Sequence, residues 1–329
     1  MLRALPVLAF VAGGCTCLGG HGELHFPDGG PEAGGGPGGD GAVAPADAGG
    51  GSDGGPGVLV RPEPLPESLY AEAVAFLDRK LWVLGGNDGC GSMDRAYYYD
   101  FDAPALGWRT GPSLPEPVSF GGVTTDGARA YLGGGLDFGS RSTDIWVFDP
   151  AAPSGSEWSA GGLFPTGRSG LGAGFSAGQI LFTGGLDDQD DVLAEVWGLD
   201  PATLALTLRP PLPGASAHHA SATWGERVYV VSGIVPGGGI TTGVGEWNPA
   251  SGWTLVAPLP AARKYAAAAT LGGRVLVIGG QDAVGEPRGE VDLYDPVAGA
   301  WTTLPPVTPV AAAAAVAIGD AVYVVGGLR

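Results

Sequence analysis

Residues 259–303 read LPAARKYAAAATLGGRVLVIGGQDAVGEPRGEVDLYDPVAGAWTT. In this stretch an apolar run ends at Gly279-Gly280, an aromatic–acid pair follows at Tyr294-Asp295, and a tryptophan follows at Trp301. The same apolar-then-glycine tag recurs along the chain, and its copies end at Gly86, Gly135, Gly185, Gly233, Gly280 and Gly327. Successive copies lie 49, 50, 48, 47 and 47 residues apart, so the chain is a tandem repeat with a period near 50 residues.

Two further features recur in register with the tag. The first is the pair that follows each of the first five tags, at Phe101-Asp102, Phe148-Asp149, Leu199-Asp200, Trp247-Asn248 and Tyr294-Asp295. The second is the large apolar residue after each pair, at Trp108, Trp158, Leu206, Trp253 and Trp301. Short runs of β-branched and aromatic residues between turns predict antiparallel strands. Because one small sheet cannot bury both of its faces, six such sheets must stack around an axis as a β-propeller, with the tryptophans between neighbouring sheets.

A double glycine followed by spaced aromatic residues resembles the kelch repeat, and the resemblance covers residues 58–329. Two copies depart from the pattern: Ser232 replaces the first glycine of the fourth tag, and Leu206 replaces the tryptophan of the third copy. The resemblance implies an all-β, six-bladed kelch-type propeller. Residues 311–315 are five consecutive alanines, for which local propensity predicts a helix, but their place in the repeat predicts a strand.

The last repeat is incomplete, because the chain stops at Arg329 just after the sixth tag. Residues 58–62 (VLVRP) align with an outermost strand, so we expect this N-terminal strand to join the last blade and close the ring. Residues 24–26 are one candidate for the missing third strand. The alternatives are a three-stranded blade, a truncated chain and a patch with no structural role.

The N-terminal segment predicts an export signal. Residues 1–15 (MLRALPVLAFVAGGC) carry one early arginine and a nine-residue apolar run, which is too short to cross a bilayer. Their ending resembles a bacterial lipobox, which implies lipidation of Cys15 and anchoring in the cell envelope, at the outer membrane; without lipidation the protein would be secreted. Residues 16–57, rich in Gly, Pro and Asp, are expected to be a disordered tether between this anchor and the propeller at 58–329.

Composition excludes several classes of function. The chain has 16 basic and 34 acidic residues, a net charge of −18, which disfavours a nucleic-acid partner. The sequence contains no nucleophile elbow, phosphate loop or paired metal motif, and we expect no cofactor. His218 and His219 are adjacent, so on a strand they would point to opposite faces and could not chelate one ion, unlike the copper site of the galactose oxidase type. With three cysteines there is no disulfide framework; Cys17 and Cys90 could pair, but a free thiol is favoured.

Acidic residues lie two positions after four of the tags, at Asp88, Asp137, Asp187 and Asp282. Clustered carboxylates could hold Ca²⁺, but their spacing does not match an EF-hand loop, and acidic loops are most often simply solvated. We therefore predict no metal site.

The loops after the tags and the linkers between blades should share one face of the propeller, with the mouth of the central channel on it. Eight residues in the linkers are candidates for binding at this mouth: Tyr70, Phe120, Arg168, Ser169, His218, Arg263, Lys264 and Tyr265. The three cations among them could attract an anionic small molecule. The alternative, which we favour for each single residue, is that Arg168 and Arg263 pair with nearby carboxylates.

Fold-level resemblance favours a binding module over an enzyme. We expect a membrane-anchored, extracytoplasmic, monomeric propeller that binds a protein or a glycan on its loop face. The alternative is an enzyme acting on a sugar acid and resembling the bacterial kelch-type sialic acid epimerase. In that case Arg168 or Arg263 would hold a carboxylate, and His218 or a loop acid would move the proton. A structural module without a ligand is a third possibility.

Overall fold

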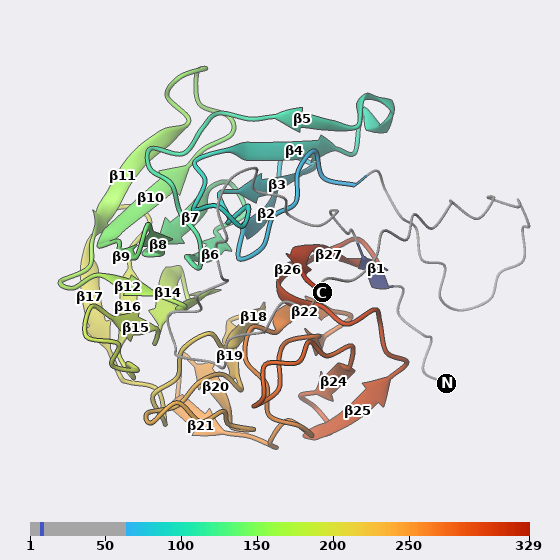
Figure 1. Ribbon diagram of the computed structural model, residues 1–329. Helices are drawn as coiled ribbons and strands as arrows, with labels where there is room; N and C mark the ends of the chain where they lie inside the picture. Colours follow the sequence, from blue (N-terminus) through green and yellow to red (C-terminus); the bar gives the residue numbers. More distant parts are fainter. Residues whose placement is uncertain (1–6, 10–63) are drawn as a thin grey trace, which may run out of the picture.

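The computed structural model describes residues 7–9 and 64–329 (Figure 1). Among these residues the regular secondary structure consists of strands, and the single helical element is one 3₁₀ turn, Pro104–Leu106. The sheets surround a common centre, with the first strand of each repeat innermost and the fourth at the rim (Figure 1). The chain is therefore an all-β propeller, as the repeat predicted.

Five repeats form complete four-stranded antiparallel blades in chain order from the centre outward. The first contains β2 (Ala73–Leu77), β3 (Lys80–Leu84), β4 (Ala96–Asp100) and β5 (Trp108–Thr110), and the second contains β6 (Gly122–Thr125), β7 (Ala130–Gly133), β10 (Asp144–Phe148) and β11 (Trp158–Leu163). The third contains β13 (Gly172–Ser176), β14 (Gln179–Thr183), β16 (Val196–Leu199) and β17 (Leu206–Arg209). The fourth contains β18 (Ala220–Trp224), β19 (Arg227–Val231), β20 (Val244–Asn248) and β21 (Gly252–Leu255), and the fifth contains β22 (Ala267–Leu271), β23 (Arg274–Ile278), β24 (Val291–Asp295) and β25 (Ala300–Leu304).

The predicted count of six blades is wrong, because the sixth repeat does not make a complete blade. It forms a hairpin of β26 (Ala311–Ile318) and β27 (Ala321–Leu328), and β26 lies between β22 of the fifth blade and β2 of the first. β1 (Val7–Ala9) pairs with β27 in parallel, with Val7 opposite Val322 and Ala9 opposite Val324. The strands predicted at residues 58–62 and 24–26 lie outside the described residues, as do Cys15 and the tether. The alanine run does lie in a strand, β26, so the place in the repeat decided over local helix propensity.

A ring of backbone hydrogen bonds joins all six repeats around the centre. One residue of each linker donates its N–H to the carbonyl of the equivalent residue in the preceding repeat, over 2.7–3.0 Å. The ring runs through Ala71, Phe120, Gly170, His218, Tyr265 and Ala312, and Ala71 donates to Ala312 to close it. All six residues have a positive φ, between 48° and 62°, which costs a non-glycine residue about 1 kcal/mol or more. The surrounding blades must therefore hold this conformation in place.

The tag glycines are required where consecutive repeats approach most closely. An added Cβ at the first glycine of a tag would lie 2.4 Å from Val118 O at Gly85, 2.4 Å from Arg168 O at Gly134 and 2.2 Å from Val310 O at Gly279. Ser232 holds this place in the fourth blade with φ 63°, and its hydroxyl accepts a hydrogen bond from the Arg263 N–H at 2.9 Å. The departure from glycine is thus compensated by a polar contact to the next linker.

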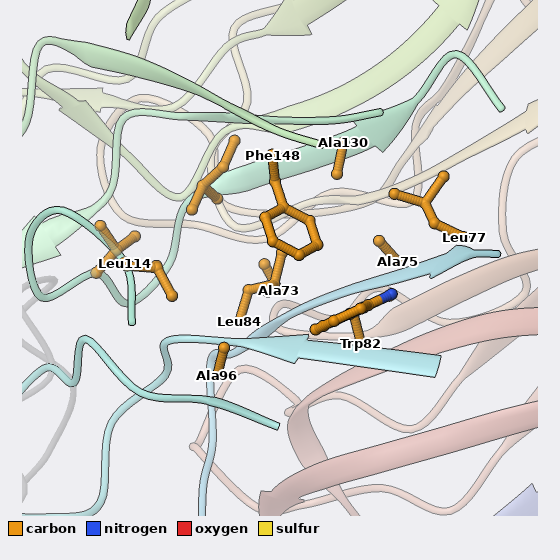
Figure 2. Close-up of a cluster of buried hydrophobic side chains, with 11 residues drawn as sticks. Ala73, Ala75, Leu77, Trp82, Leu84, Ala96, Leu114, Ala130 and Phe148 are labelled. Carbon is orange, nitrogen blue, oxygen red and sulfur yellow. The ribbon is translucent and has the colours of Figure 1, made fainter. Parts of the chain in front are cut away.

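The hydrophobic core lies in the seams between neighbouring blades. In the seam between the first two blades, Trp82 packs edge-on against Phe148 with ring centroids 4.8 Å apart (Figure 2). The repeated tryptophans bind the linker of the preceding blade: the indole of Trp158 donates to Pro112 O, that of Trp253 to Pro210 O and that of Trp301 to Ala257 O, at 2.8–3.2 Å. Their predicted place between blades is confirmed.

Candidate binding site at the channel mouth

One face of the propeller carries both the linkers and the loops that follow the tags. Short antiparallel pairings join them, between Tyr70 and Asn87, Ser119 and Leu136, Ala217 and Ile234, and Lys264 and Gln281. In the third blade the same pairing is a two-residue ladder of β12 (Arg168–Ser169) and β15 (Leu186–Asp187). We call this face the loop face. The structure places the linkers and loops together on it, as the order of strands predicted.

Three of the predicted site residues converge at the mouth of the channel. The rings of Phe120, His218 and Tyr265 contact one another, with centroids 4.5 Å apart for His218 and Tyr265, 5.1 Å for Phe120 and His218, and 5.7 Å for Phe120 and Tyr265. They come from the positive-φ ring, which turns these side chains toward the centre. A cavity of about 130 Å³ adjoins them and is also lined by Ala71, Glu72, Gly121, Gly170, Leu171, His219, Ala266, Ala312 and Ala313. The aromatic residues therefore narrow the channel to a small chamber.

Tyr70, Ser169 and Lys264 lie around these three aromatic side chains. Tyr70 is buried and packs edge-on against Phe120 at 6.3 Å. The hydroxyl of Ser169 accepts a hydrogen bond from Arg141 Nε at 3.0 Å. Lys264 is half-buried, and its ammonium group lies 5.3 Å from the centre of the Tyr265 ring, within cation–π range.

The structure does not bring Arg168 and Arg263 into the mouth. Arg168 is 1% exposed, binds Glu195 at 3.1 Å and lies over the ring of Phe164 at 4.6 Å. Arg263 is 2% exposed and forms an ion pair with the equally buried Asp292. Burial lowers the pKa of the Arg168 guanidinium, and Glu195 counters that effect. Both side chains are buried in ion pairs within the propeller, so a funnel of three cations does not form at the mouth. A sugar-acid enzyme would therefore lack the two guanidinium groups that the sequence assigned to its substrate.

Two buried ionisable residues beside the chamber were not predicted from the sequence. Burial raises the pKa of Glu72 to about 8, although two backbone N–H groups, its own and that of Ala314, oppose the shift. Its carboxyl group lies against Gly326 of β27, where an added Cβ would be 2.3 Å from Oε1, so it occupies the seam between the last hairpin and the first blade. Burial also lowers the pKa of His219 to about 4, and its Nε2 lies 3.1 Å from Thr183 Oγ1 in the seam between the third and fourth blades. Glu72 and His219 lie at the same distance before the tags that follow them, and this shared position in the repeat is the sequence signal that could have identified them.

The acidic residues after the tags shape their own loops. Oδ1 of Asp88 accepts hydrogen bonds from the N–H groups of Cys90 and Gly91, that of Asp187 from Gln189 and Asp191, and that of Asp282 from Val284 and Glu286, all at 2.8–3.1 Å. Asp137 differs, because burial raises the pKa of its carboxyl group. In the described part of the chain no three His, Cys, Asp or Glu side chains gather where they could hold a metal ion.

Cys90 is disulfide-bonded, so its interpretation as a free thiol is wrong. The two other cysteines of the chain, Cys15 and Cys17, lie outside the described residues. Within residues 7–9 and 64–329 no helix has the length and hydropathy needed to span a membrane.

The repeat, the seams and the tag glycines agree with what family comparison finds. The model of the KLHDC2/KLHL20/DRC7 Kelch-repeats domain matches residues 59–238, more than half of the chain, and the Kelch motif model matches residues 262–308. The chain belongs to the kelch-repeat family. The fold is therefore a kelch-type β-propeller with five complete blades.

Individual kelch proteins resemble this one over part of their length. Kelch-like protein terF of Aspergillus terreus is 36% identical over 191 residues, which are 54% of this chain and 41% of terF. Beta-scruin of Limulus polyphemus is 25% identical over 195 residues, 55% of this chain and 21% of beta-scruin. The aligned segments thus span less than half of either relative. The solved structure titled "Structure of YjhT" superposes with a TM-score of 0.68 at 15% identity, covering 80% of this chain and 91% of that one, and supports the fold.

Proposed function

We propose that this kelch propeller is a membrane-anchored, extracytoplasmic binding module that holds a protein partner on its loop face. The observation that carries the proposal is an exposed aromatic residue at the tip of a loop on this face. Phe138 lies between the strands β8 (Leu136–Asp137) and β9 (Ser140–Arg141), is 78% exposed and has φ 43°. A large ring held in water by a strained backbone is an unusual use of an apolar residue, and aromatic residues dominate the energetics of protein interfaces.

A second exposed apolar residue lies on the same face. Val284 is 67% exposed in the loop after the fifth tag, as Phe138 is in the loop after the second. Two apolar side chains on separate loops of one face give a partner two points of contact. Isolated exposed apolar residues are common, so the shared face and the loop setting matter more than exposure by itself.

Charge indicates the kind of partner. Between these two loops the third loop carries Asp187, Asp188, Asp190 and Asp191, and Arg141 is paired with Asp190 at 2.5 Å. The predicted cations Arg168 and Arg263 are buried, so they do not offset this acidity at the surface. Complementary charge steers association and selects partners, which favours a protein with a basic surface.

The location of the protein and the closure of its ring are parts of the same proposal. Lipidation of Cys15 would anchor a monomeric propeller in the bacterial cell envelope, at the outer membrane, with residues 16–57 as the tether. Processing at Cys15 would remove β1, which precedes it in the chain. Residues 58–62 would then pair with the outer edge of β27 as a third strand of the last sheet.

Photo-crosslinking tests partner binding on the loop face. A benzoylphenylalanine at position 138, in the full chain in the cells that produce it, should give one discrete protein adduct. Changing the four aspartates at 187, 188, 190 and 191 to Asn should reduce that adduct and make what remains less sensitive to salt. The matched control is the same crosslinker at Val297, which is 89% exposed in the turn between β24 and β25 on the opposite face. Equal adducts from positions 138 and 297, or none from 138, would contradict the proposal.

A further inference from the structure

A second concavity lies apart from the channel mouth. A cleft of about 760 Å³ opens between the first and second blades, between the linker after β5 and the turn that joins β10 and β11. Its lining residues are Lys80, Trp82, Tyr98, Thr110, Gly111, Pro112, Ser113, Pro115, Pro150, Ser154, Gly155, Glu157 and Trp158. Its volume is in the range of clefts that bind small molecules.

One wall of this cleft is built by a departure from the repeat. Eight residues, 150–157, separate Asp149 from Trp158 in the second blade, whereas five residues, 296–300, separate Asp295 from Trp301 in the fifth. The first and third blades also have five residues at this place, and the fourth has four. The longer turn contributes Pro150, Ser154, Gly155 and Glu157 to the cleft. The other four blades fold with a shorter turn at this place, so the fold does not require the longer one. This difference points to a role for the turn other than folding.

Aromatic rings form the base of the cleft. Tyr98 stacks at a tilt on Trp82, Trp82 meets Phe148, and Phe148 meets Trp158, each with centroids 4.8 Å apart. Trp82 is buried, but Tyr98 and Trp158 are only half-buried and so present part of their rings to the cleft. The Arg109 guanidinium lies over the Tyr98 ring at 5.5 Å, and the Trp158 indole is held by Pro112 O. Both ring positions are therefore fixed before any ligand arrives.

Polar groups line the rim, and their charges balance. Lys80 Nζ is 2.6 Å from Asp78 Oδ2, and Glu157 Oε2 accepts a hydrogen bond from Gly155 N at 2.7 Å, which leaves further donors on the ammonium and the second oxygen on the carboxylate. Hydroxyl groups of Thr110, Ser113 and Ser154 complete the lining. One cation, one anion and several hydroxyls suit a ligand that is uncharged and carries many hydroxyl groups.

We infer that this cleft binds a neutral oligosaccharide. A sugar ring has an apolar face of C–H groups that can stack on Tyr98 and Trp158, and an edge of hydroxyls that can both donate to Glu157 and accept from Lys80. A proline-rich peptide also docks in aromatic grooves, but its carbonyl groups need donors, and the Trp158 indole already donates to Pro112 O. A sugar acid would be attracted by Lys80 but repelled by Glu157, so the cleft does not favour a negatively charged ligand. The site is independent of the proposed partner binding, because neither Phe138 nor Val284 nor the aspartates of the third loop line the cleft.

Calorimetric titration of the full chain tests the inference with cellohexaose, laminarihexaose and chitohexaose as neutral probes, and with a hexamer of galacturonic acid and decaproline as competitors. We expect saturable binding of at least one neutral hexamer. Replacing residues 150–157 with the fifth-blade turn Pro-Val-Ala-Gly-Ala should weaken that binding at least ~10-fold while the melting temperature is retained. Tyr98→Leu is the second variant, because it keeps apolar volume but removes the stacking face, and should weaken binding by a similar factor.

Asp188→Asn on the loop face is the matched control and should leave saccharide affinity unchanged. No heat with any neutral hexamer would overturn the inference. So would a folded turn-exchange variant that binds as well as the parent. Binding of decaproline in place of the sugars would show a peptide groove instead, and preference for the galacturonic acid hexamer would show an anion site.

Discussion

Two seams of this propeller, one between the first two blades and one that closes the ring, differ in chemistry. The seam between the first two blades is apolar: Trp82, Leu84, Leu114, Leu132 and Phe148 are all at most 5% exposed (Figure 2). The seam where the last hairpin meets the first blade also has an apolar cluster, with Leu81, Val83 and Val325 fully buried, but it carries the Glu72 carboxyl group against Gly326. The seam between the first two blades is thus set by apolar packing, whereas the seam that closes the ring also contains a buried carboxyl group. Pairs of equivalent positions in different seams can test this difference.

The largest effect is expected at the aromatic residue before the repeated acid. Phe148→Ala should lower the free energy of unfolding by about 3–5 kcal/mol, because the ring is fully buried between Trp82 and Trp158. Its counterpart Phe101 packs on Tyr323 of the last hairpin at 5.5 Å but is only half-buried, so Phe101→Ala should cost roughly half as much. Denaturant unfolding of both variants measures the ratio. Equal losses would mean that the closing seam is packed as tightly as the complete ones.

The two buried arginines should differ for an electrostatic reason. Arg263→Met leaves Asp292, whose side chain is 3% exposed, without its cation, which should cost about 3–5 kcal/mol. Arg168→Met should cost about 1–2 kcal/mol, because the side chain of Glu195 is 47% exposed and can turn to water. Adding Asp292→Asn to Arg263→Met should recover part of the loss. An equal cost for both single variants would contradict the role of partner burial.

Glu72 and His219 occupy equivalent places in two seams and should give opposite pH dependences. The pKa of Glu72 is raised from 4.5 to about 8, so the folded state keeps a proton that the unfolded chain releases, and stability should fall as pH rises through this window, at up to about 1.4 kcal/mol per pH unit. The pKa of His219 is lowered from 6.5 to about 4, so the unfolded chain binds the extra proton and stability should fall as pH drops below 6.5. The two contributions oppose each other between pH 4.5 and 6.5.

Between pH 6.5 and 8 only Glu72 contributes to this pair of effects, which makes the window diagnostic. Chemical denaturation across it should show a falling free energy of unfolding for the parent and a flatter profile for Glu72→Gln. His219→Gln, in contrast, should change the profile only below pH 6.5. A parent profile that Glu72→Gln does not alter would show that the carboxyl group titrates normally.

The smallest effect is expected at the tag position that already departs from glycine. Ser232→Gly should change stability by about 1 kcal/mol or less, because relief of the positive φ offsets the lost hydrogen bond from the Arg263 N–H. Gly279→Ser, the reverse change one blade later, should be clearly destabilising, because an added Cβ would lie 2.2 Å from Val310 O. Thermal melting of the two variants compares the same position in adjacent seams. Similar tolerance at both would mean that the hydroxyl contact does not matter.

Much of the fold follows from the sequence because the same pattern of tag, aromatic–acid pair and large apolar residue recurs in successive repeats. The tag at Gly280 and the pair at Tyr294 mark the ends of two strands, and the first five repeats carry both features. Trp301 marks a seam contact that Trp158 and Trp253 also make. The number of blades could not be predicted from the sequence. A sixth tag indicates two more strands, but it does not show whether further strands pair with them. At the mouth, the structure brings Phe120, His218 and Tyr265 together, as the alignment of the linkers indicated. Arg168 and Arg263 pair with carboxylates, which was the favoured interpretation for each, and the alternative of a cationic funnel fails. The sequence left both open, since alignment within a repeat does not show which way a linker side chain turns.

By itself the sequence determined a period of about 50 residues, antiparallel strands and glycines at fixed places, because these depend on local turns and on alternating burial within one repeat. Only the tertiary structure decided how Arg263 finds Asp292, how Glu72 comes to lie against Gly326, and how the longer turn of the second blade, residues 150–157, lines a cleft with the first blade. The physical reason is distance along the chain: Glu72 and Gly326 stand at opposite ends of the propeller sequence. Their contact exists only once the ring of hydrogen bonds from Ala71 to Ala312 has closed.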